Sequence, residues 1–266
     1  MEDAVTIQQS TTDRQALEVR TWERGTGSPV VYLHGFAGFV DGDEFLEGLA
    51  GHHRVIAPEH PGFGGSTGID EIDDVIDMAL HYRRFIERSA TGPVDLVGHS
   101  LGGMFAAEVA ALCPQLVRRL VLIAPFGLWL DDHPTPDLFA ISPNRLQQAT
   151  WADAESRAAQ EFLTRLGNAG GGGIDAIVER AMNLSAAGKF LWPLPDRGLR
   201  KRFSFIEAPT LVIAGEGDQL VPPRYCEEFA GAIAGARMAT VAGAGHYPTV
   251  EQCEATRSLV AEFLAG

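Results

Sequence analysis

The most constraining feature of this sequence is a series of short apolar runs rich in β-branched residues. Within each run, apolar side chains occupy successive positions, as in strands that are buried on both faces of a parallel sheet. Segments with helical spacing of apolar residues, at 72–86 and 101–112, separate these runs. The pattern predicts an α/β protein with a mostly parallel sheet wrapped by helices. The runs are residues 30–35 (VVYLHG), 54–58 (RVIAP), 94–100 (VDLVGHS), 118–125 (RRLVLIAP) and 210–218 (TLVIAGEGD).

Two parts of the chain depart from this alternation. Residues 16–25 are expected to form one arm of an antiparallel edge hairpin with residues 4–8. More than eighty residues separate Pro125 from Pro209 and contain helical patterns without a convincing strand, which is too long for a simple connection. We therefore expect a helical cap insertion over residues 127–204, with a glycine run at 170–173 between two of its helices. The main domain would then comprise residues 1–126 and 205–266.

Composition restricts the class of partner. The 266 residues suffice for one large α/β domain, and the formal net charge of −14 opposes binding to nucleic acids and anionic membranes. No run approaches the roughly 18 apolar residues of a membrane span, and the N-terminus lacks a secretory pattern. The cysteines at 113, 226 and 253 show no metal-binding spacing and are expected to be reduced thiols. We expect a cytoplasmic protein that acts on a small molecule without a metal or cofactor; a homodimer is compatible with the sequence.

Ser100 lies between two glycines at the end of a predicted strand, in the sequence LVGHSLGG of residues 96–103. A turn that leads straight from a strand into a helix needs small residues two positions away on either side, and Gly98 and Gly102 meet that need. Gly103 would let the helix approach the sheet. Such a turn presents the serine hydroxyl at a helix N-terminus, over the edge of the sheet. The motif alone is also compatible with an ordinary helix-capping serine.

Two other strand ends supply the groups that a serine nucleophile needs. Asp218 follows one predicted strand and His246 follows the last one. A base must take the proton of the serine hydroxyl, and a carboxylate must hold the tautomer of that base and stabilise its charged form. Ligands of open parallel sheets bind beyond the carboxyl ends of the strands. We therefore predict Ser100 as nucleophile, His246 as base and Asp218 as acid.

The segment LHGFAG, residues 33–38, ends the first buried parallel strand. Its glycines allow the backbone N–H of Phe36 to face Ser100, and the N–H of Leu101 follows the serine directly. We predict that these two donors form an oxyanion hole. His34 is expected to order this loop by hydrogen bonding rather than to transfer a proton.

Five motifs together resemble the α/β-hydrolase superfamily, over about Val30 to Leu264. They are HGFAG (34–38), PGFGGS (61–66), GHSLGG (98–103), GEGDQLVP (215–222) and GAGHYP (243–248). The resemblance implies the α/β-hydrolase fold: a mostly parallel eight-stranded sheet flanked by helices, with a helical cap insertion. It assigns the same triad and oxyanion donors, and it says little about the substrate. One departure is Glu59-His60 at the entrance of the PGFGGS loop, where many relatives have aspartate or arginine; it is expected to reshape that loop only.

Several residues are assigned by weaker signals. Candidates for the wall of an apolar substrate pocket are Phe36, Phe126, Trp192 and Tyr247. Arg180 and Lys189 are candidates for binding a substrate carboxylate, with solvent exposure as the alternative. His99 is expected to pack and hydrogen-bond beside the serine. We interpret His52, His53, His60, His81 and His133 as surface or loop histidines, and Asp131 and Asp132 as a less favoured position for the acid.

A serine nucleophile narrows the chemistry. Displacing a halide or opening an epoxide would leave a stable ether on serine, so these reactions are excluded in favour of acyl transfer to water. The leading prediction is hydrolysis of a carboxylic ester of a small apolar or aromatic substrate. The alternatives are carbon–carbon hydrolysis of ring-cleavage products, cofactor-free oxygenase or perhydrolase chemistry, lactone or amide hydrolysis, and a non-enzymatic ligand receptor. Relatives in the carbon–carbon branch often carry Asn and Trp where this chain has His99 and Tyr247.

Overall fold

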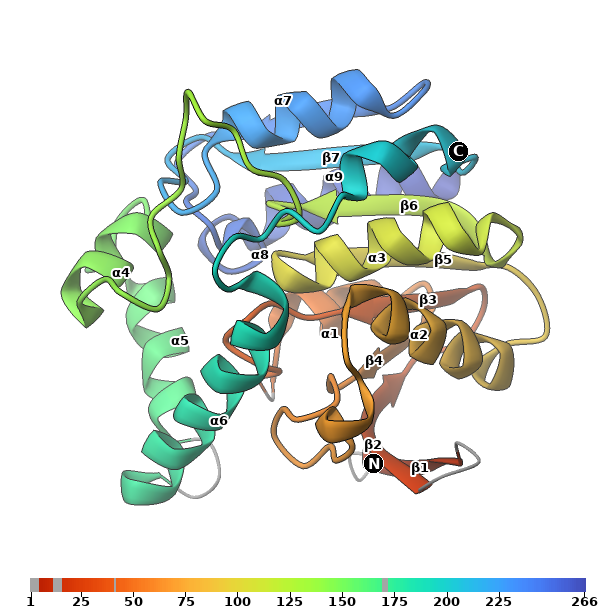
Figure 1. Ribbon diagram of the computed structural model, residues 1–266, viewed down its shortest axis with the longest axis horizontal. Helices are drawn as coiled ribbons and strands as arrows, with labels where there is room; N and C mark the ends of the chain where they lie inside the picture. Colours follow the sequence, from red (N-terminus) through yellow and green to blue (C-terminus); the bar gives the residue numbers. More distant parts are fainter. Residues whose placement is uncertain (1–4, 12–15, 41, 169–171) are drawn as a thin grey trace.

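Strands in the described part of the chain form one eight-stranded sheet in the order β1-β2-β4-β3-β5-β6-β7-β8 (Figure 1). The computed structural model describes residues 5–11, 16–40, 42–168 and 172–266. β1 pairs with β2 and β2 pairs with β4 in antiparallel fashion, whereas the remaining neighbours are parallel. The mostly parallel sheet and the antiparallel edge hairpin are both confirmed; residue 4 of the predicted hairpin lies outside the described residues.

The elements have the following bounds. The strands are β1 Val5–Thr11, β2 Ala16–Arg24, β3 Pro29–Leu33, β4 Arg54–Pro58, β5 Val94–His99, β6 Val117–Ile123, β7 Thr210–Gly215 and β8 Arg237–Val241. The α-helices are α1 Glu44–Ala50, α2 Val75–Ser89, α3 Leu101–Leu112, α4 Pro143–Thr150, α5 Arg157–Asn168, α6 Gly173–Leu191, α7 Pro223–Ala232, α8 Pro248–Glu251 and α9 Cys253–Ala265. Short 3-10 helices are η1 Ile69–Glu71, η2 Pro114–Leu116 and η4 Leu199–Phe205.

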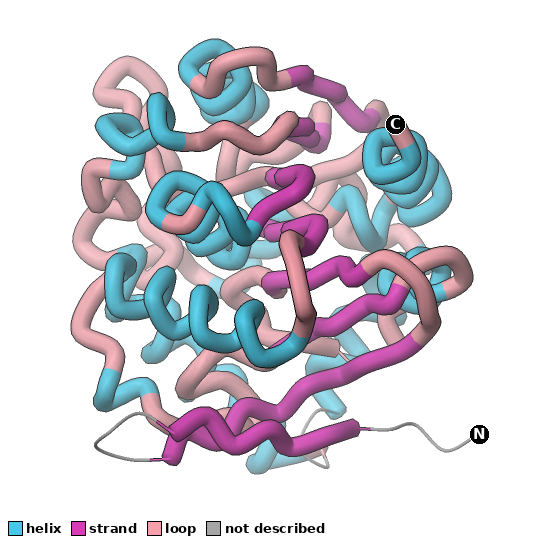
Figure 2. Tube along the Cα trace, turned by 90° about the vertical axis from the view of Figure 1, so that its right-hand side faces the viewer, coloured by secondary structure: helices cyan, strands magenta, loops and turns pink. Residues whose placement is uncertain are grey.

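Successive residues of the central strands supply the cores on the two faces of the sheet. Val31 and Leu33 of β3 pack in the core that contains residues of α2 and α3. Val30 and Tyr32, which alternate with those two residues along β3, belong to the core formed with α1 and α9. Figure 2 shows the strands as a twisted layer with helices on both sides. This arrangement explains why the strands are apolar at successive positions.

Helix α3, which follows Ser100, is held on both sides. Its first eleven residues, Leu101 to Ala111, are all buried. Glu108 has no exposed surface and accepts two hydrogen bonds of 2.6 Å from the guanidinium of Arg202 in η4. This ion pair joins α3 to η4, the segment that leads into β7. The helix that follows Ser100 is therefore fixed to the end of the connection between β6 and β7.

The connection between β6 and β7 contains α4, α5, α6 and η4, and no strand among its described residues. In Figure 1 the three α-helices gather beyond one end of the sheet, where the chain leaves β6. Residues 169–171 of the predicted glycine break lie outside the described residues. The division into a main domain of residues 1–126 and 205–266 and a cap of residues 127–204 stays a prediction.

No helix in the described ranges is both long and apolar enough to cross a bilayer.

His60 and His81, predicted as surface or loop histidines, are both buried. His60 does lie in a loop, whereas His81 lies within α2, so for His81 the prediction is wrong. His60 is 0% exposed and His81 is 5% exposed, whereas His52 and His133 are exposed. His60 hydrogen-bonds His34 and Tyr82, which are distant in sequence. His81 lies on the buried side of α2 with its ring 5.2 Å from that of Tyr82. The partners of His60 come from other elements, which the spacing of histidines along the chain does not reveal.

Burial of His81 predicts a loss of stability in acid. The burial lowers its pKa to about 4, with the charges of Arg88 and Arg84 adding to the effect, and its Nε2 has no hydrogen-bond partner. Between that pKa and the unfolded value near 6.5, the unfolded chain binds more protons, so stability falls by about 1.4 kcal/mol per pH unit as pH decreases through this window.

Substituting His81→Phe should remove this dependence, because phenylalanine fills a similar volume and does not titrate. The free energy of unfolding of the variant minus that of the wild type should be about 2 kcal/mol larger at pH 5 than at pH 8. Urea unfolding of both proteins at the two pH values measures this difference. His133→Phe, at an exposed position, serves as the control. Parallel pH profiles for the wild type and His81→Phe would contradict this assignment.

Candidate active site

Ser100 occupies a strained turn between β5 and α3, with φ 58° and ψ −118°. The turn is close to the neighbouring strand. A Cβ on Gly102 would lie 2.1 Å from the carbonyl oxygen of Leu33, and a Cβ on Gly98 would lie 2.3 Å from that of Gly102. The N–H of Ser100 donates to the carbonyl of Ile123 at 2.8 Å, which holds the turn from the β6 side. The glycines therefore permit a contact between backbones that any side chain would prevent.

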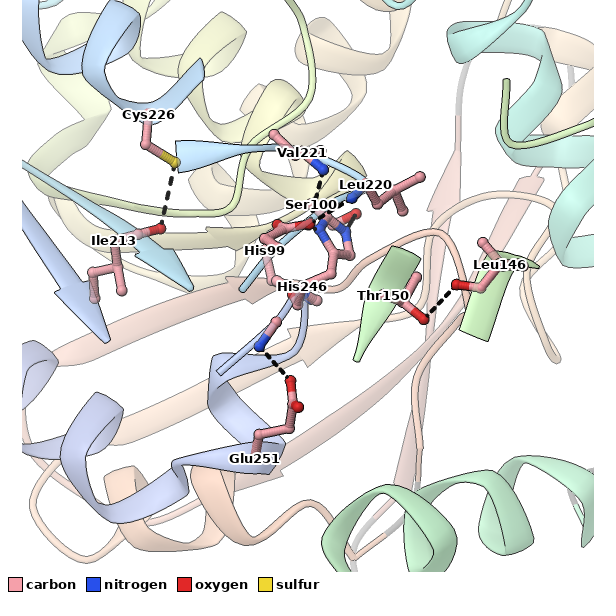
Figure 3. A network of polar contacts seen from close by, with 12 residues as sticks. His99, Ser100, Leu146, Thr150, Ile213, Leu220, Val221, Cys226, His246 and Glu251 are labelled. Carbon is pink, nitrogen blue, oxygen red and sulfur yellow. Dashed lines mark hydrogen bonds and ion pairs between the residues drawn. The ribbon is translucent and has the colours of Figure 1, made fainter. Parts of the chain in front are cut away.

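Ser100, His246 and Asp218 form a continuous hydrogen-bonded chain. The Ser100 Oγ and the His246 Nε2 are 2.8 Å apart, and the His246 Nδ1 lies 2.8 Å from the Asp218 Oδ2. Figure 3 shows Ser100 and His246 together, with the backbone nitrogens of Leu220 and Val221 close by. Those two N–H groups donate to the Asp218 Oδ1 at 2.9 and 2.8 Å. One carboxylate oxygen is thus fixed by the backbone and the other faces the imidazole, so Nδ1 carries the proton and Nε2 can accept one from serine.

A segment at the end of α4 supports both the acid and the base. The carbonyl of Thr150 accepts a hydrogen bond of 2.6 Å from the N–H of His246, and the carbonyl of Ala149 accepts one of 3.0 Å from Gln219. Trp151 follows directly, and its ring stacks on that of Tyr247 with centroids 4.6 Å apart. No sequence pattern indicates this role, because a backbone carbonyl can be supplied by any residue type.

Glu251 is a second supporting group, which no motif in the sequence indicates. Its two carboxylate oxygens accept hydrogen bonds from the N–H of Gly245 at 2.7 Å and of Ala152 at 2.8 Å. Burial raises its pKa despite these donors. Glu251 therefore fastens the loop that carries His246 to the segment after α4.

The loop after β3 lies directly against the serine. A Cβ on Gly35 would be 3.1 Å from the Cβ of Ser100, and the N–H of Gly102 donates to the carbonyl of His34 at 3.0 Å. Within the described residues, the backbone N–H groups of Phe36 and Leu101 donate no hydrogen bond to the protein. Leu101 begins α3, where N–H groups have no partner within the helix. Both predicted oxyanion donors are therefore free to bind a ligand atom.

His34 orders this loop, as predicted. Its Nε2 accepts the N–H of His60 at 2.9 Å, so its Nδ1 carries the proton and donates to the carbonyl of Gly35 at 2.8 Å. His60 returns a hydrogen bond from Nε2 to the carbonyl of His34 at 2.8 Å, and the two rings stack. Burial lowers the pKa of His34 to about 4, and burial also holds the pKa of His60 well below its ordinary value. The stacked pair is therefore neutral near pH 7 and keeps fixed tautomers.

His99 also matches its prediction. Its Nε2 donates to the carbonyl of His246 at 2.7 Å, and its ring lies 5.5 Å from that of Tyr247. Burial lowers its pKa to about 3, with the neighbouring His246 contributing in the same direction. The residue before the serine thus holds the main chain of the base.

A cavity of about 390 Å³ is lined by residues between 138 and 184 and by Phe36, Ala37 and Tyr247, the neighbour of His246 in sequence. Phe36 and Tyr247 form its wall on the side of the triad, and most of the remaining lining side chains are apolar. Phe126 lines a second cavity, of about 180 Å³. Ser100 and His246 are both 0% exposed, and three aromatic rings pack around His246. The ring centroids of Phe36, Phe126 and Tyr247 lie 6.0, 5.7 and 5.5 Å from that of His246.

Trp192 does not line either cavity, and its assignment to the pocket wall was wrong. Its side chain is 59% exposed, whereas Phe190 and Leu191 directly before it are buried. Trp192 follows the last residue of α6, and the inward positions at this helix end are already filled by those two side chains.

The charged side chains predicted to bind a carboxylate, or to serve as an alternative acid, occupy different places in the structure. Arg180 is exposed and lines the larger cavity. Lys189 is exposed and donates from Nζ to the carbonyl of Ile69 at 2.9 Å, and it lines neither cavity. Asp131 and Asp132 are exposed, and the carboxylate bound to His246 is that of Asp218. Among the described residues, no group of three or more His, Cys, Asp or Glu side chains is placed to hold a metal ion.

The family model for the alpha/beta hydrolase fold matches residues 28–252. The chain belongs to the α/β-hydrolase family. It is 30% identical to a pimeloyl-[acyl-carrier protein] methyl ester esterase of Xanthomonas oryzae pv. oryzae, over 91% of this chain and 97% of that protein. It is 27% identical to the 2-hydroxy-6-oxo-6-(2'-aminophenyl)hexa-2,4-dienoic acid hydrolase of Metapseudomonas resinovorans, over 94% and 88%. The esterase structure from Exiguobacterium antarcticum has the same fold, with a TM-score of 0.78, 22% identity and 98% of each chain covered.

The close approach at Gly102 in this α/β hydrolase predicts a large effect of a single methyl group. We expect Gly102→Ala to lower the free energy of unfolding by about 3 kcal/mol, since the new Cβ would overlap the backbone of β3. Gly92→Ala is the matched control, because nothing lies within 4 Å of a Cβ at that position. It should change stability by no more than about 0.5 kcal/mol in urea unfolding. Equal stability of the two variants would contradict the proposed backbone contact.

Proposed function

We propose that this protein is a serine hydrolase that cleaves a carboxylic ester through an acyl-enzyme. The observation that carries the proposal is the hydrogen-bonded chain from the Ser100 Oγ through His246 to Asp218, with 2.8 Å at each contact. Distances in this range allow proton transfer between nucleophile and base without further movement. The triad is also buried, so few water dipoles weaken the electrostatic interactions among Ser100, His246 and Asp218.

The first half of the reaction forms the acyl-enzyme. The Ser100 Oγ attacks the ester carbonyl carbon while its proton passes to the Nε2 of His246. The negative charge that develops on the carbonyl oxygen is stabilised by the free N–H groups of Phe36 and Leu101. When the tetrahedral intermediate collapses, the bond to the alcohol oxygen breaks and His246 gives its proton to that oxygen.

The second half repeats the sequence with water. His246 takes a proton from the water, whose oxygen attacks the acyl carbon, and the bond to the Ser100 Oγ then breaks. Serine regains its proton from His246 and the carboxylic acid leaves. Asp218 stays ionised throughout and stabilises the charged imidazole, helped by two backbone donors that fix its orientation.

The surroundings of the triad indicate an apolar acyl or alkyl group as the part that the enzyme binds. The larger cavity, of about 390 Å³, has a mostly apolar wall that begins at Phe36 and Tyr247. Because the triad has no exposed surface, a substrate in this cavity reaches Ser100 only when one of the aromatic rings around His246 moves. We propose that binding of the ester displaces one of these rings and leaves the triad in place.

Carbon–carbon hydrolysis is the second candidate, supported by the similarity to the dienoic acid hydrolase. The same serine, base and acid would serve that reaction. His99 and Tyr247 replace the Asn and Trp that are frequent in that branch, which favours the ester.

The proposal predicts hydrolysis of p-nitrophenyl esters, with a preferred chain length between acetate and laurate. Ser100→Ala should reduce kcat on the order of 10⁴-fold or more, and Asp218→Asn should reduce it by about 10⁴-fold because the tautomer of His246 changes. Asp131→Asn, at an exposed carboxylate, is the control and should retain wild-type kcat.

Three outcomes distinguish the alternatives. A folded wild type that hydrolyses none of the esters would contradict the esterase proposal. Turnover of dienoic keto-acids in its place would favour the carbon–carbon hydrolase. Oxygen uptake that survives in Ser100→Ala would favour an oxygenase in which serine only binds the substrate.

A further inference from the structure

The larger cavity contains one charged side chain, that of Arg180, among its described lining residues. Two polar neighbours already have partners. Asn183 donates to the carbonyl of Ala37 at 3.1 Å and accepts from the N–H of Gly64 at 3.2 Å. The hydroxyl of Thr150 donates to the carbonyl of Leu146 at 2.9 Å. Arg180 is therefore the group through which this apolar cavity can recognise charge.

Arg180 has no hydrogen bond or ion pair within the described part of the chain, although the formal net charge is −14. Other arginines near the long connection are paired: Arg157 with Glu161 at 2.6 Å and Arg202 with Glu108 at 2.6 Å. An unpaired guanidinium beside an apolar wall offers donors in a planar fork that matches a carboxylate.

The helix places Arg180 on the cavity side. Ile177, three positions before Arg180, and Leu184, four positions after it, also line the cavity. Positions spaced by three and four residues share one face of a helix, so α6 presents Arg180 within an apolar stripe. The side chain is thus part of the wall rather than of the opposite, outer face.

The reaction centre is near. Asn183, one helical turn after Arg180, is bound to the carbonyl of Ala37, next to the oxyanion donor Phe36. Three residues of α-helix advance by only about 4.5 Å. The positive charge of Arg180 also acts on the hydroxyl of Tyr247, whose pKa it lowers against the larger, opposite effect of burial. A ligand of modest length can therefore reach from Ser100 to the guanidinium.

We propose that Arg180 binds a carboxylate at the far end of the acyl chain, so that the preferred substrate class is the half-ester of a linear dicarboxylic acid. This proposal rests on the proposed esterase function. The ester carbonyl lies at Ser100, the methylene chain fills the apolar cavity, and the terminal carboxylate pairs with the guanidinium. A single guanidinium and a single carboxylate neutralise each other, which suits a monoanion.

The test compares charged and neutral esters of equal chain length. Monomethyl adipate and monomethyl suberate are the charged substrates, and methyl hexanoate and methyl octanoate are their neutral counterparts. Arg180→Gln should lower kcat/KM for the half-esters about tenfold or more, chiefly through KM, and affect the neutral esters far less. Arg180→Glu should lower it further by repulsion.

Lys189→Gln is the control, since Lys189 is an exposed cation on the same helix that does not line the cavity. It should leave both classes of substrate unchanged. If Arg180→Gln changes neither class, or both equally, the carboxylate site is overturned and Arg180 is only a surface charge.

A binding measurement separates this proposal from the esterase proposal. Calorimetric titration of Ser100→Ala with monomethyl suberate needs no turnover. Binding that weakens about tenfold in the Ser100→Ala/Arg180→Gln double variant supports the carboxylate site even if the wild type hydrolyses no ester. Equal affinities for the half-ester in the two variants, or no binding by Ser100→Ala, would overturn the site even if ester hydrolysis is established.

Discussion

The contact between the turn at Ser100 and the end of β3 is the constraint on which the rest of the site depends. Gly102 lies so close to the carbonyl of Leu33 that a Cβ there would be 2.1 Å from it. This approach forces the serine into a left-handed conformation and places its hydroxyl beyond the sheet. It also brings the loop after β3 against Ser100, and the N–H groups of Phe36 and Leu101 in the described structure donate to no protein acceptor. Nucleophile and oxyanion donors are thus set by one packing contact.

The base and acid are brought to this turn by contacts from the long connection between β6 and β7. The carbonyl of Thr150 holds the main chain of His246, and that of Ala149 holds the loop of Asp218. Glu251 hydrogen-bonds both the loop that carries His246 and the segment that follows α4. The segment that borders the large cavity therefore also positions the triad.

The sequence predicted what local chemistry dictates. Buried parallel strands carry apolar residues at successive positions, and the turn at Ser100 needs glycines at fixed spacing, so the sheet and the turn were foreseeable. Residues at strand ends meet at one edge, which brought Asp218 and His246 to the serine. The burial of His60 and the role of Glu251 depend on packing between distant elements. No spacing along the chain encodes those contacts.

The covalent intermediate offers the most direct test of the central claim. The protein is mixed with p-nitrophenyl butyrate, quenched in acid within one turnover and analysed by mass spectrometry of the intact chain and its peptides. The account predicts one butyryl group per chain, on the peptide that contains Ser100, and no modification of Ser100→Ala. The account would be contradicted if the wild type released p-nitrophenol without any acylated Ser100, or if another residue were acylated.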